Sequence, residues 1–258
     1  MDLELVLLGT GTSVGVPVLG CQCPTCLSSD PRDRRTRSAA WVRTPECSFV
    51  IDTGPDLKEQ CLREGVGEVN AALYTHSHTD HTVGFDDLRP FCFRRETRFP
   101  VYGSGRTLRA LERMFPWAFD AEMRPGYVRV TSHVVEDAFT LGKTRITPIP
   151  MEHGSEQAYG YRFDREGCAP LAYLTDCKRV LPKGLERLAG VELAVVDALR
   201  EKPHPTHMNF DEAADLVRLL KVRRAWFTHL THDLTHDEVS ARVPEQVEPA
   251  YDGLRIQP

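Results

Sequence analysis

The feature that most constrains this chain is a cluster of three histidines and one carboxylate within residues 75–81, Thr-His-Ser-His-Thr-Asp-His. The preceding residues 69–74 are short, mostly apolar and β-favouring, which predicts a buried strand. Residues 82–93 are interpreted as a loop that enters a short helix. The polar cluster therefore follows the carboxyl end of a strand, and its members are His76, His78, Asp80 and His81.

These residue types in this pattern indicate a metal site. Alternation along an extended chain sends His76 and His78 to the same side. Asp80 and His81 follow where the chain turns, so they can face a second point close by. Neutral imidazole and carboxylate are ligands for divalent metals of borderline softness. The alternative is a histidine-rich surface loop, and it leaves unexplained the ligand-type residues that occur later in the chain.

Three later segments each place one ligand-type residue after an apolar, strand-like run. They are His153 after residues 146–149, Asp176 after residues 171–174 and His229 after residues 225–227. With the histidine cluster, they resemble the signature of the metallo-β-lactamase superfamily. In that family a His-x-His-x-Asp-His motif precedes a lone histidine, a bridging aspartate and a final histidine. The order here is the same, and the match covers nearly the whole chain.

The resemblance implies an α/β fold, namely the metallo-β-lactamase αββα sandwich of two mixed sheets flanked by helices. Strand-like and helix-like segments alternate along the sequence, which is consistent with such layers. A length of 258 residues fits one large domain, and a hydrophobic content of 41% supports a substantial core. No linker divides the sequence, so we predict a single domain over residues 1–258.

The resemblance also implies two catalytic divalent metals, for which mixed imidazole and carboxylate ligands favour manganese or zinc. One metal would be held by His76, His78 and His153, and the other by Asp80, His81 and His229, with Asp176 bridging them. Asp80 thereby also belongs to the catalytic residues. Two cations roughly 3.5–4 Å apart can activate a shared hydroxide for attack on phosphorus.

A second cluster, Cys21, Cys23 and Cys26, places three thiols within six residues. Three thiolates suit a structural zinc, which needs a fourth ligand. The candidate is His232, three residues after His229. The cysteine triplet and the paired histidine resemble a phosphodiesterase branch of the superfamily, the PhnP-like proteins. Reduced thiols without a metal are the alternative.

In that branch, a histidine at the entrance to a helix faces the substrate phosphate. His207 precedes a helical pattern at residues 211–220 and occupies the matching position. The resemblance therefore implies that His207 is catalytic, either as the acid for the leaving group or as a group that positions the substrate. A surface-loop histidine is the alternative. We expect His204, which lies between Pro203 and Pro205, to be exposed.

Three other segments carry weaker expectations. Residues 49–54 form a strand that ends in Asp52, and in the family this aspartate supports the metal-ligand loop without binding metal. Residues 9–17 form a glycine-rich turn, which is either a tight connection or an element beside the substrate. The charged residues 30–37 are interpreted as a solvated loop.

Composition restricts the classes of partner. A net charge of −5 argues against a nucleic-acid partner. No apolar run approaches the roughly 20 residues that a membrane span needs. The first residues lack the basic segment of a signal peptide, and the cysteines do not suggest a disulfide framework. We therefore expect a cytoplasmic protein with no membrane partner, and a homodimer stays open.

The function that the resemblance implies is hydrolysis of small phosphodiesters, cyclic ones included, by a hydroxide that two metals activate. The alternatives are a hydrolase of another ester such as a lactone or thioester, a tRNA 3′-end endonuclease, and a non-catalytic carrier protein on the same fold. The sequence lacks a long basic insertion to grip tRNA, and every ligand position is filled, unlike in a carrier. A metal count discriminates, because about three metals per chain fit an enzyme with a structural zinc.

Overall fold

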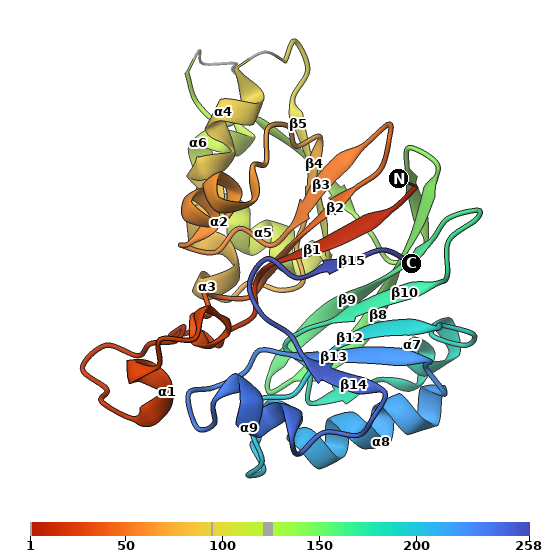
Figure 1. Ribbon diagram of the computed structural model, residues 1–258. Coiled ribbons are helices and arrows are strands. Elements are labelled where there is room, and N and C mark those ends of the chain that lie inside the picture. Colours follow the sequence, from red (N-terminus) through yellow and green to blue (C-terminus); the bar gives the residue numbers. More distant parts are fainter. Residues whose placement is uncertain (1, 94, 121–125) are drawn as a thin grey trace.

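The computed structural model describes residues 2–93, 95–120 and 126–258. Two β-sheets pack face to face, and helices cover the outer face of each (Figure 1). Strands of the N-terminal half, red to yellow in Figure 1, build most of the first sheet, and green to blue strands build the second. The αββα sandwich of two mixed sheets expected from the sequence is confirmed.

The first sheet has the strand order β15-β1-β2-β3-β4-β5-β6. Its strands are β1 (Glu4–Gly9), β2 (Ala39–Arg43), β3 (Ser48–Ile51), β4 (Ala71–Leu73), β5 (Phe99–Gly103), β6 (Val130–Val134) and β15 (Arg255–Ile256). Strands β3 to β6 pair in parallel, whereas β1, β2 and β15 pair antiparallel to their neighbours. Because parallel strands end at the same edge, the segments after β3 and β4 meet there.

The second sheet has the order β11-β8-β9-β10-β12-β13-β14, with β7 beside β8. Its strands are β7 (Phe139–Leu141), β8 (Thr144–His153), β9 (Glu156–Asp164), β10 (Leu171–Leu174), β11 (Arg179–Val180), β12 (Leu193–Asp197), β13 (Arg224–Thr228) and β14 (Val247–Pro249). Strands β10, β12, β13 and β14 are parallel. Their carboxyl ends therefore form a second row of loops, which faces the loops of the first sheet.

Helices flank both sheets, with α2, α4, α5 and α6 beside the first and α8 and α9 beside the second (Figure 1). The helices are α1 (Pro24–Leu27), α2 (Leu57–Glu64), α3 (Thr79–Thr82), α4 (Arg89–Cys92), α5 (Gly105–Met114), α6 (Pro116–Phe119), α7 (Pro182–Arg187), α8 (Phe210–Leu220) and α9 (His236–Ser240), with 3₁₀ turns at Pro31–Asp33 and Val83–Leu88. In the described parts of the chain, none of them is long and apolar enough to cross a bilayer.

Helix ends follow local capping chemistry. Helix α5 begins at Gly105, because the hydroxyl of Ser104 accepts a hydrogen bond from the amide of Thr107. At the start of α9, Thr235 and Glu238 form a capping box.

The layer between the sheets is built from fully buried aromatic and aliphatic side chains. Phe49 of β3 and Phe163 of β9 meet across it, with ring centroids 6.1 Å apart. Burial of each such side chain contributes roughly 1.5–3 kcal/mol to the free energy of folding. Each sheet also packs on its own helices through one further apolar cluster. The loops at the strand ends are therefore carried by a rigid platform.

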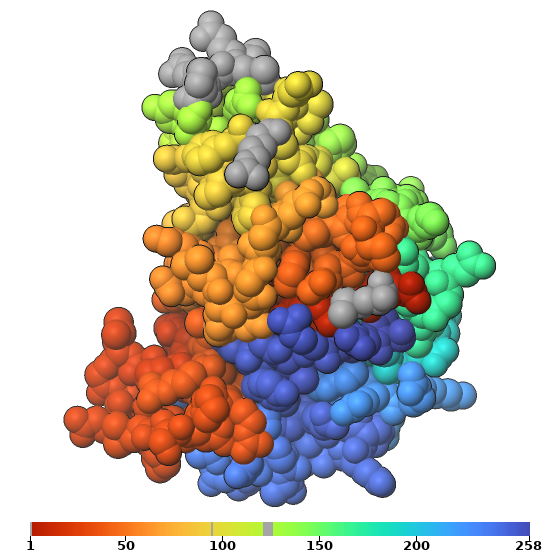
Figure 2. All heavy atoms as spheres, turned by 45° about the horizontal axis from the view of Figure 1, so that its top comes forward, coloured from red at the N-terminus to blue at the C-terminus, as the bar shows by residue number. Residues whose placement is uncertain are grey.

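Residues 12–35 leave the sandwich as an arm that contains α1, at the lower left of Figure 1. In Figure 2 this arm, orange-red, lies beside blue C-terminal residues. The Arg35 guanidinium donates to the carbonyl of Ala250, and Oδ1 of Asp33 accepts from the amide of His236 over 2.7 Å. Asp33 and Arg35 are each only 2% exposed. The expectation of a solvated loop at residues 30–37 is therefore wrong for these two residues, since they tie the arm to the C-terminal segment.

Candidate metal centres and catalytic site

The residues expected to bind the catalytic metals converge at one edge of the sandwich, at the end of β8 and in the segments that follow β4, β10 and β13. They form two groups, His76 with His78 and His153, and Asp80 with His81, Asp176 and His229. Within each group the ligand atoms lie within 4.8 Å of one another. The fold thus brings together all seven predicted metal ligands, although they are spread over residues 76–229 of the sequence.

Asp176 lies between the two groups. Its Oδ2 is 3.8 Å from Nε2 of His76 and 3.7 Å from Nε2 of His153. Its Oδ1 is 3.2 Å from Nε2 of His81 and 3.5 Å from Nε2 of His229. The two oxygens of one carboxylate therefore face different histidine groups, which is the arrangement that a bridging ligand requires.

The backbone turns abruptly where these strands end. Asp52, Asp176 and His229 adopt left-handed conformations, with φ of 63°, 54° and 60°. Such values are uncommon for residues other than glycine, and strained residues of this kind concentrate at functional sites. Two of the three residues belong to the metal groups, and Asp52 contacts a member of one of them.

Several buried nitrogen atoms at this edge have no hydrogen-bond partner among the residues that the structure describes. They are Nε2 of His76, Nε2 of His81 and both ring nitrogens of His229. Burying polar atoms without partners is costly, so a cluster of them needs an explanation. Burial also lowers the pKa values of His76 and His229, which keeps both rings in the neutral form that binds metals. The donor set therefore fits a pair of divalent cations.

A buried carboxylate orients His81. Its Nδ1 donates to Oδ2 of Asp52 over 2.7 Å, and Asp52 also accepts from the amide and hydroxyl of Thr75. Burial opposes protonation of His81, but Asp176 and Asp52 outweigh it and hold the pKa of His81 well above its usual range. Asp52 thus has the supporting contacts expected of it. Gly54 is required here, because a Cβ would lie 2.2 Å from the carbonyl oxygen of Asp80.

His153 is oriented by the loop before α8. Its Nδ1 donates to the carbonyl of Thr206 over 2.9 Å, which leaves its Nε2 to face Nδ1 of His78 at 3.2 Å. The proton on Nδ1 fixes the tautomer, so Nε2 carries the lone pair. Nε2 of His153 and Nδ1 of His78 therefore face each other within this metal group.

His207 stands beside the metal groups and is 8% exposed. Its ring stacks on that of His229 with centroids 4.4 Å apart, and lies 4.6 Å from that of His153. Its Nδ1 donates to Oδ2 of Asp197 over 2.7 Å. Burial lowers the pKa of His207 and raises the pKa of Asp197 to about 8. Since Nδ1 is occupied, Nε2 is the ring nitrogen left for another partner.

Asp197 was not among the residues selected from the sequence. Besides His207, it accepts a hydrogen bond from the amide of Cys177 over 2.6 Å, and its Oδ1 lies 3.9 Å from Nδ1 of His229. Its position in the sequence could have indicated a role, because Asp197 ends the buried strand β12, just as the metal-group residues lie at or after the ends of their strands. One carboxylate thus faces both a metal-group histidine and the catalytic candidate.

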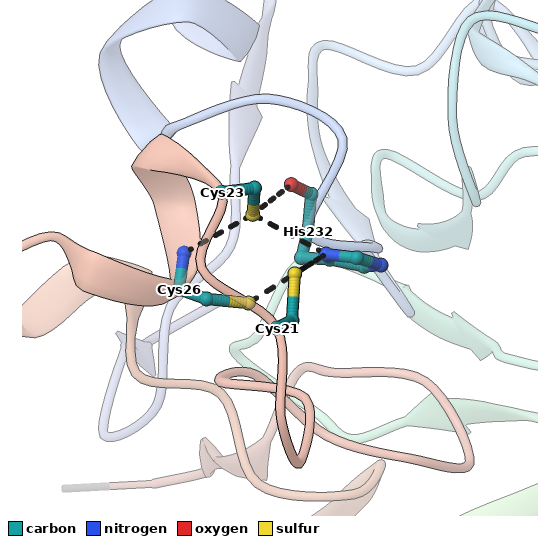
Figure 3. Close-up of side chains that lie close together, drawn as sticks. All are labelled: Cys21, Cys23, Cys26 and His232. Carbon is teal, nitrogen blue, oxygen red and sulfur yellow. Dashed lines mark hydrogen bonds between the residues drawn. The ribbon is translucent and has the colours of Figure 1, made fainter.

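The thiol cluster forms a closed group with His232 (Figure 3). Nδ1 of His232 is 3.4 Å from Sγ of Cys21, 3.4 Å from Sγ of Cys23 and 3.6 Å from Sγ of Cys26. Zinc bonds of about 2.3 Å to sulfur and 2.0–2.1 Å to nitrogen imply ligand spacings of about 3.5 Å in a tetrahedron, so the group fits zinc. A hydrogen bond from the amide of Cys26 lowers the pKa of Cys23 to about 6, assisted by His232.

The thiol group and the metal groups share one loop. His229 and His232 are three residues apart, directly after β13. Between them, the amide of Leu230 donates to the carbonyl of Thr10 over 3.0 Å. The glycine-rich turn after β1 therefore pairs with the loop that carries His229, which gives that turn a place beside the metal centre.

Comparison with known proteins agrees with this geometry. A family model described as beta-lactamase superfamily domain matches residues 48–230. The chain is similar to an octanoyltransferase of Porphyromonas gingivalis, with 31% identity over 98% of this chain and 51% of the relative. It therefore spans about half the length of that relative.

Two solved structures are also similar. The crystal structure of a new diphosphatase from the PhnP family has a TM-score of 0.90 and 39% identity, covering 99% of this chain and 97% of that one. Zinc-bound PqqB from Methylobacterium extorquens has a TM-score of 0.77 and 19% identity, covering 98% and 99%. The second likeness concerns the fold alone.

Proposed function

Because this chain belongs to the metallo-β-lactamase superfamily, as a PhnP-like member, we propose that it is a metal-dependent hydrolase of small phosphodiesters. The observation that carries the proposal is the position of Asp176, whose two oxygens face two separate histidine groups. A substrate phosphoryl group placed between these groups would also lie beside His207.

The metals belong to this proposal. His76, His78 and His153 would hold one cation, Asp80, His81 and His229 would hold the other, and Asp176 would serve both. When bound, two manganese or zinc ions lower the pKa of a water molecule and offset the negative charge of a phosphoryl group. Cys21, Cys23, Cys26 and His232 would hold a structural zinc.

His207 completes the reaction on the leaving-group side. Asp197 keeps a proton on Nδ1, so that Nε2 faces the substrate. As water oxygen bonds to phosphorus, the bond from phosphorus to the leaving oxygen breaks, and Nε2 of the imidazolium gives its proton to that oxygen. Burial lowers the pKa of His207, so the imidazolium forms only transiently, and the hydrogen bond from Nδ1 to Oδ2 of Asp197 at 2.7 Å holds the ring in place while it carries that proton.

The complete ligand set supports catalysis over a carrier role. Each of the seven positions carries a residue that can bind metal, and three of these residues, His76, His81 and His229, have buried ring nitrogens without a hydrogen-bond partner in the described part of the chain. The pair of His207 and Asp197 supports a reaction with a poor leaving group, which an alkoxide is and a thiolate is not. Location in the cytoplasm, without a nucleic-acid or membrane partner, is part of the proposal.

The test uses purified protein with manganese or zinc added after chelation. We expect hydrolysis of bis(p-nitrophenyl) phosphate and of a 2′,3′-cyclic nucleotide, with one atom of ¹⁸O from labelled water in the phosphate product. A lactone, a thioester and a precursor tRNA serve as comparison substrates. Hydrolysis of one of these, with no cleavage of either phosphodiester, would overturn the proposal.

A further inference from the structure

His204 lies beside the catalytic histidine, although its two neighbouring prolines led us to expect an exposed side chain. Its ring centroid is 5.3 Å from that of His207, and the side chain is half-buried. Within residues 2–93, 95–120 and 126–258, His204 makes no other ring contact. The ring of His207 lies 4.4 Å from that of His229 and 4.6 Å from that of His153. His204, on the other side of His207, is therefore one ring farther from the metal groups.

The hydrogen bonds of His204 fix its tautomer. The amide of Thr206 donates to Nδ1 over 3.4 Å, and the hydroxyl of Thr206 lies 3.2 Å from the same nitrogen. A backbone amide can only donate, so Nδ1 is the acceptor and Nε2 carries the hydrogen. Burial, and then the charges of His207 and Arg200, lower the pKa of His204. The ring is therefore neutral near pH 7 and presents one N–H.

Thr206 holds this ring rigidly relative to the metal site. Its carbonyl accepts from Nδ1 of His153, while its amide serves His204. The methyl group of Thr206 packs so closely on Gly154, whose φ is 59°, that a Cβ there would lie 2.9 Å away. One residue thus sets the positions of a metal-group histidine and of His204, so the N–H of His204 is preorganised with respect to the reacting centre.

Two donors, His204 and the Arg200 guanidinium whose charge acts on it, lack partners in the described part of the protein. Nε2 of His204 makes no hydrogen bond there. The Arg200 guanidinium, which follows β12, makes no ion pair with a described residue, and its buried Nε has no hydrogen-bond partner. The N–H of a neutral imidazole and a guanidinium can only donate hydrogen bonds. A ligand that bonds to both must therefore supply acceptor atoms such as oxygens.

We propose that His204 is a substrate-contacting residue, whose Nε2–H donates a hydrogen bond to an oxygen of the leaving group beyond His207, with Arg200 adding positive charge there. The inference rests on the proposed phosphodiesterase function and specifies its substrate class. The leaving group carries acceptor oxygens, which belong either to a sugar or to a second phosphate. Substrates with a plain aromatic leaving group do not use this contact.

Three substrates test the inference. Methyl p-nitrophenyl phosphate has a plain leaving group, uridylyl-(3′→5′)-uridine has a sugar leaving group, and the same dinucleotide with a 3′-terminal phosphate adds an anion. For His204→Leu we expect KM to rise about 5- to 10-fold for the oxygen-rich substrates, the loss typical of one hydrogen bond. We expect kcat to change little, and both constants to stay unchanged for the methyl ester.

Matched variants separate the hydrogen bond from other effects. His204→Gln keeps an N–H near the position of Nε2 and is expected to recover most of the lost affinity. His133→Leu removes an exposed histidine on β6 that stacks on Tyr102, and it is expected to have no effect. If His204→Leu folds poorly, Thr206→Val against Thr206→Ser tests the same contact, because only valine lacks the hydroxyl beside Nδ1.

The outcomes distinguish this inference from the proposed function. A rise in KM for both dinucleotides assigns the contact to sugar oxygens, and a rise confined to the phosphorylated one assigns it to a second phosphate. Equal kinetics of wild type and His204→Leu on all three substrates, or wild-type activity on the methyl ester alone, would overturn the inference while leaving the phosphodiesterase intact. A wild type inactive on every phosphodiester would overturn both.

Discussion

Oδ2 of Asp197 accepts a hydrogen bond from Nδ1 of His207 over 2.7 Å, while its other oxygen lies 3.9 Å from Nδ1 of His229. One buried carboxylate therefore faces both the residue proposed to serve the leaving group and a residue proposed to hold metal. Because the rings of His207 and His229 also stack, a change at Asp197 is expected to reach both functions.

The first prediction concerns His207. His207→Ala should leave metal content unchanged, because this residue is not a metal ligand in our account. Its rate loss should be about 10²–10⁴-fold for an alkyl or ribosyl leaving group and much smaller for p-nitrophenolate, which needs little protonation. The measurement is the rate ratio of wild type to variant on two phosphodiesters that differ only in leaving-group pKa. Equal ratios would mean that His207 positions the substrate without donating a proton.

Asp197→Asn is the second prediction. The substitution keeps the shape but removes the charge that stabilises a positive His207 ring, so the rate on alkyl esters should fall toward that of His207→Ala. In the double variant the losses should not add, since the two residues act as a unit. Asp215→Asn, on the exposed face of α8, is the control. Fully additive losses would contradict the pairing.

The third prediction concerns the thiol group. Cys23→Ser should lose one zinc per chain and lower the melting temperature, because a closed zinc site contributes directly to folding free energy. A smaller loss of catalytic metal affinity should follow, since His229 and His232 share one short loop. Metal analysis and thermal unfolding measure both effects, with Cys168→Ser as the control outside the cluster. A variant that keeps its zinc and its melting temperature would show that the triplet is not a site.

A fourth prediction follows from His236, which is buried beside Arg35. Burial lowers the pKa of His236 to about 4 in the folded protein, from a usual value of 6.5. Stability from the neutral ring is therefore complete above pH 6.5 and is lost as the pH falls toward 4. The loss is at most about 3 kcal/mol.

Urea unfolding of wild type and His236→Gln between pH 7 and pH 4 measures this effect. The wild type should lose more unfolding free energy over that interval than the variant does. His133→Gln, which changes an exposed histidine, should follow the wild type. Identical pH dependence in all three proteins would contradict the role of His236.

Much of the metal site could be predicted because its residues follow strands with strong local signals. His76, Asp176 and His229 each come after a short apolar run, and parallel strands end at a common edge. The order of these residues then matched a known signature. Which oxygen of Asp176 faces which group depends on its left-handed backbone, and no local pattern indicates that conformation.

The remaining features depend on contacts between distant segments. Asp33 and Arg35 lie in a charged stretch that is typical of surface loops, yet they are buried against residues about two hundred positions away. His204 was expected to be exposed because prolines flank it, but Thr206 packs that loop against Gly154. Strand β2 is not among the elements that the sequence patterns indicate, although it pairs with both β1 and β3.

Metal stoichiometry and turnover of Asp176→Asn test the central claim most directly. The substitution keeps the size of the side chain but replaces the carboxylate oxygen pair that faces both histidine groups with one oxygen and one N–H donor. Wild type, reconstituted and dialysed, should carry about three metals per chain by the ligand sets proposed above. The variant should keep the thiol-bound zinc, lose most of the other two metals and hydrolyse bis(p-nitrophenyl) phosphate at a small fraction of the wild-type rate. Full turnover with three metals retained would contradict the account.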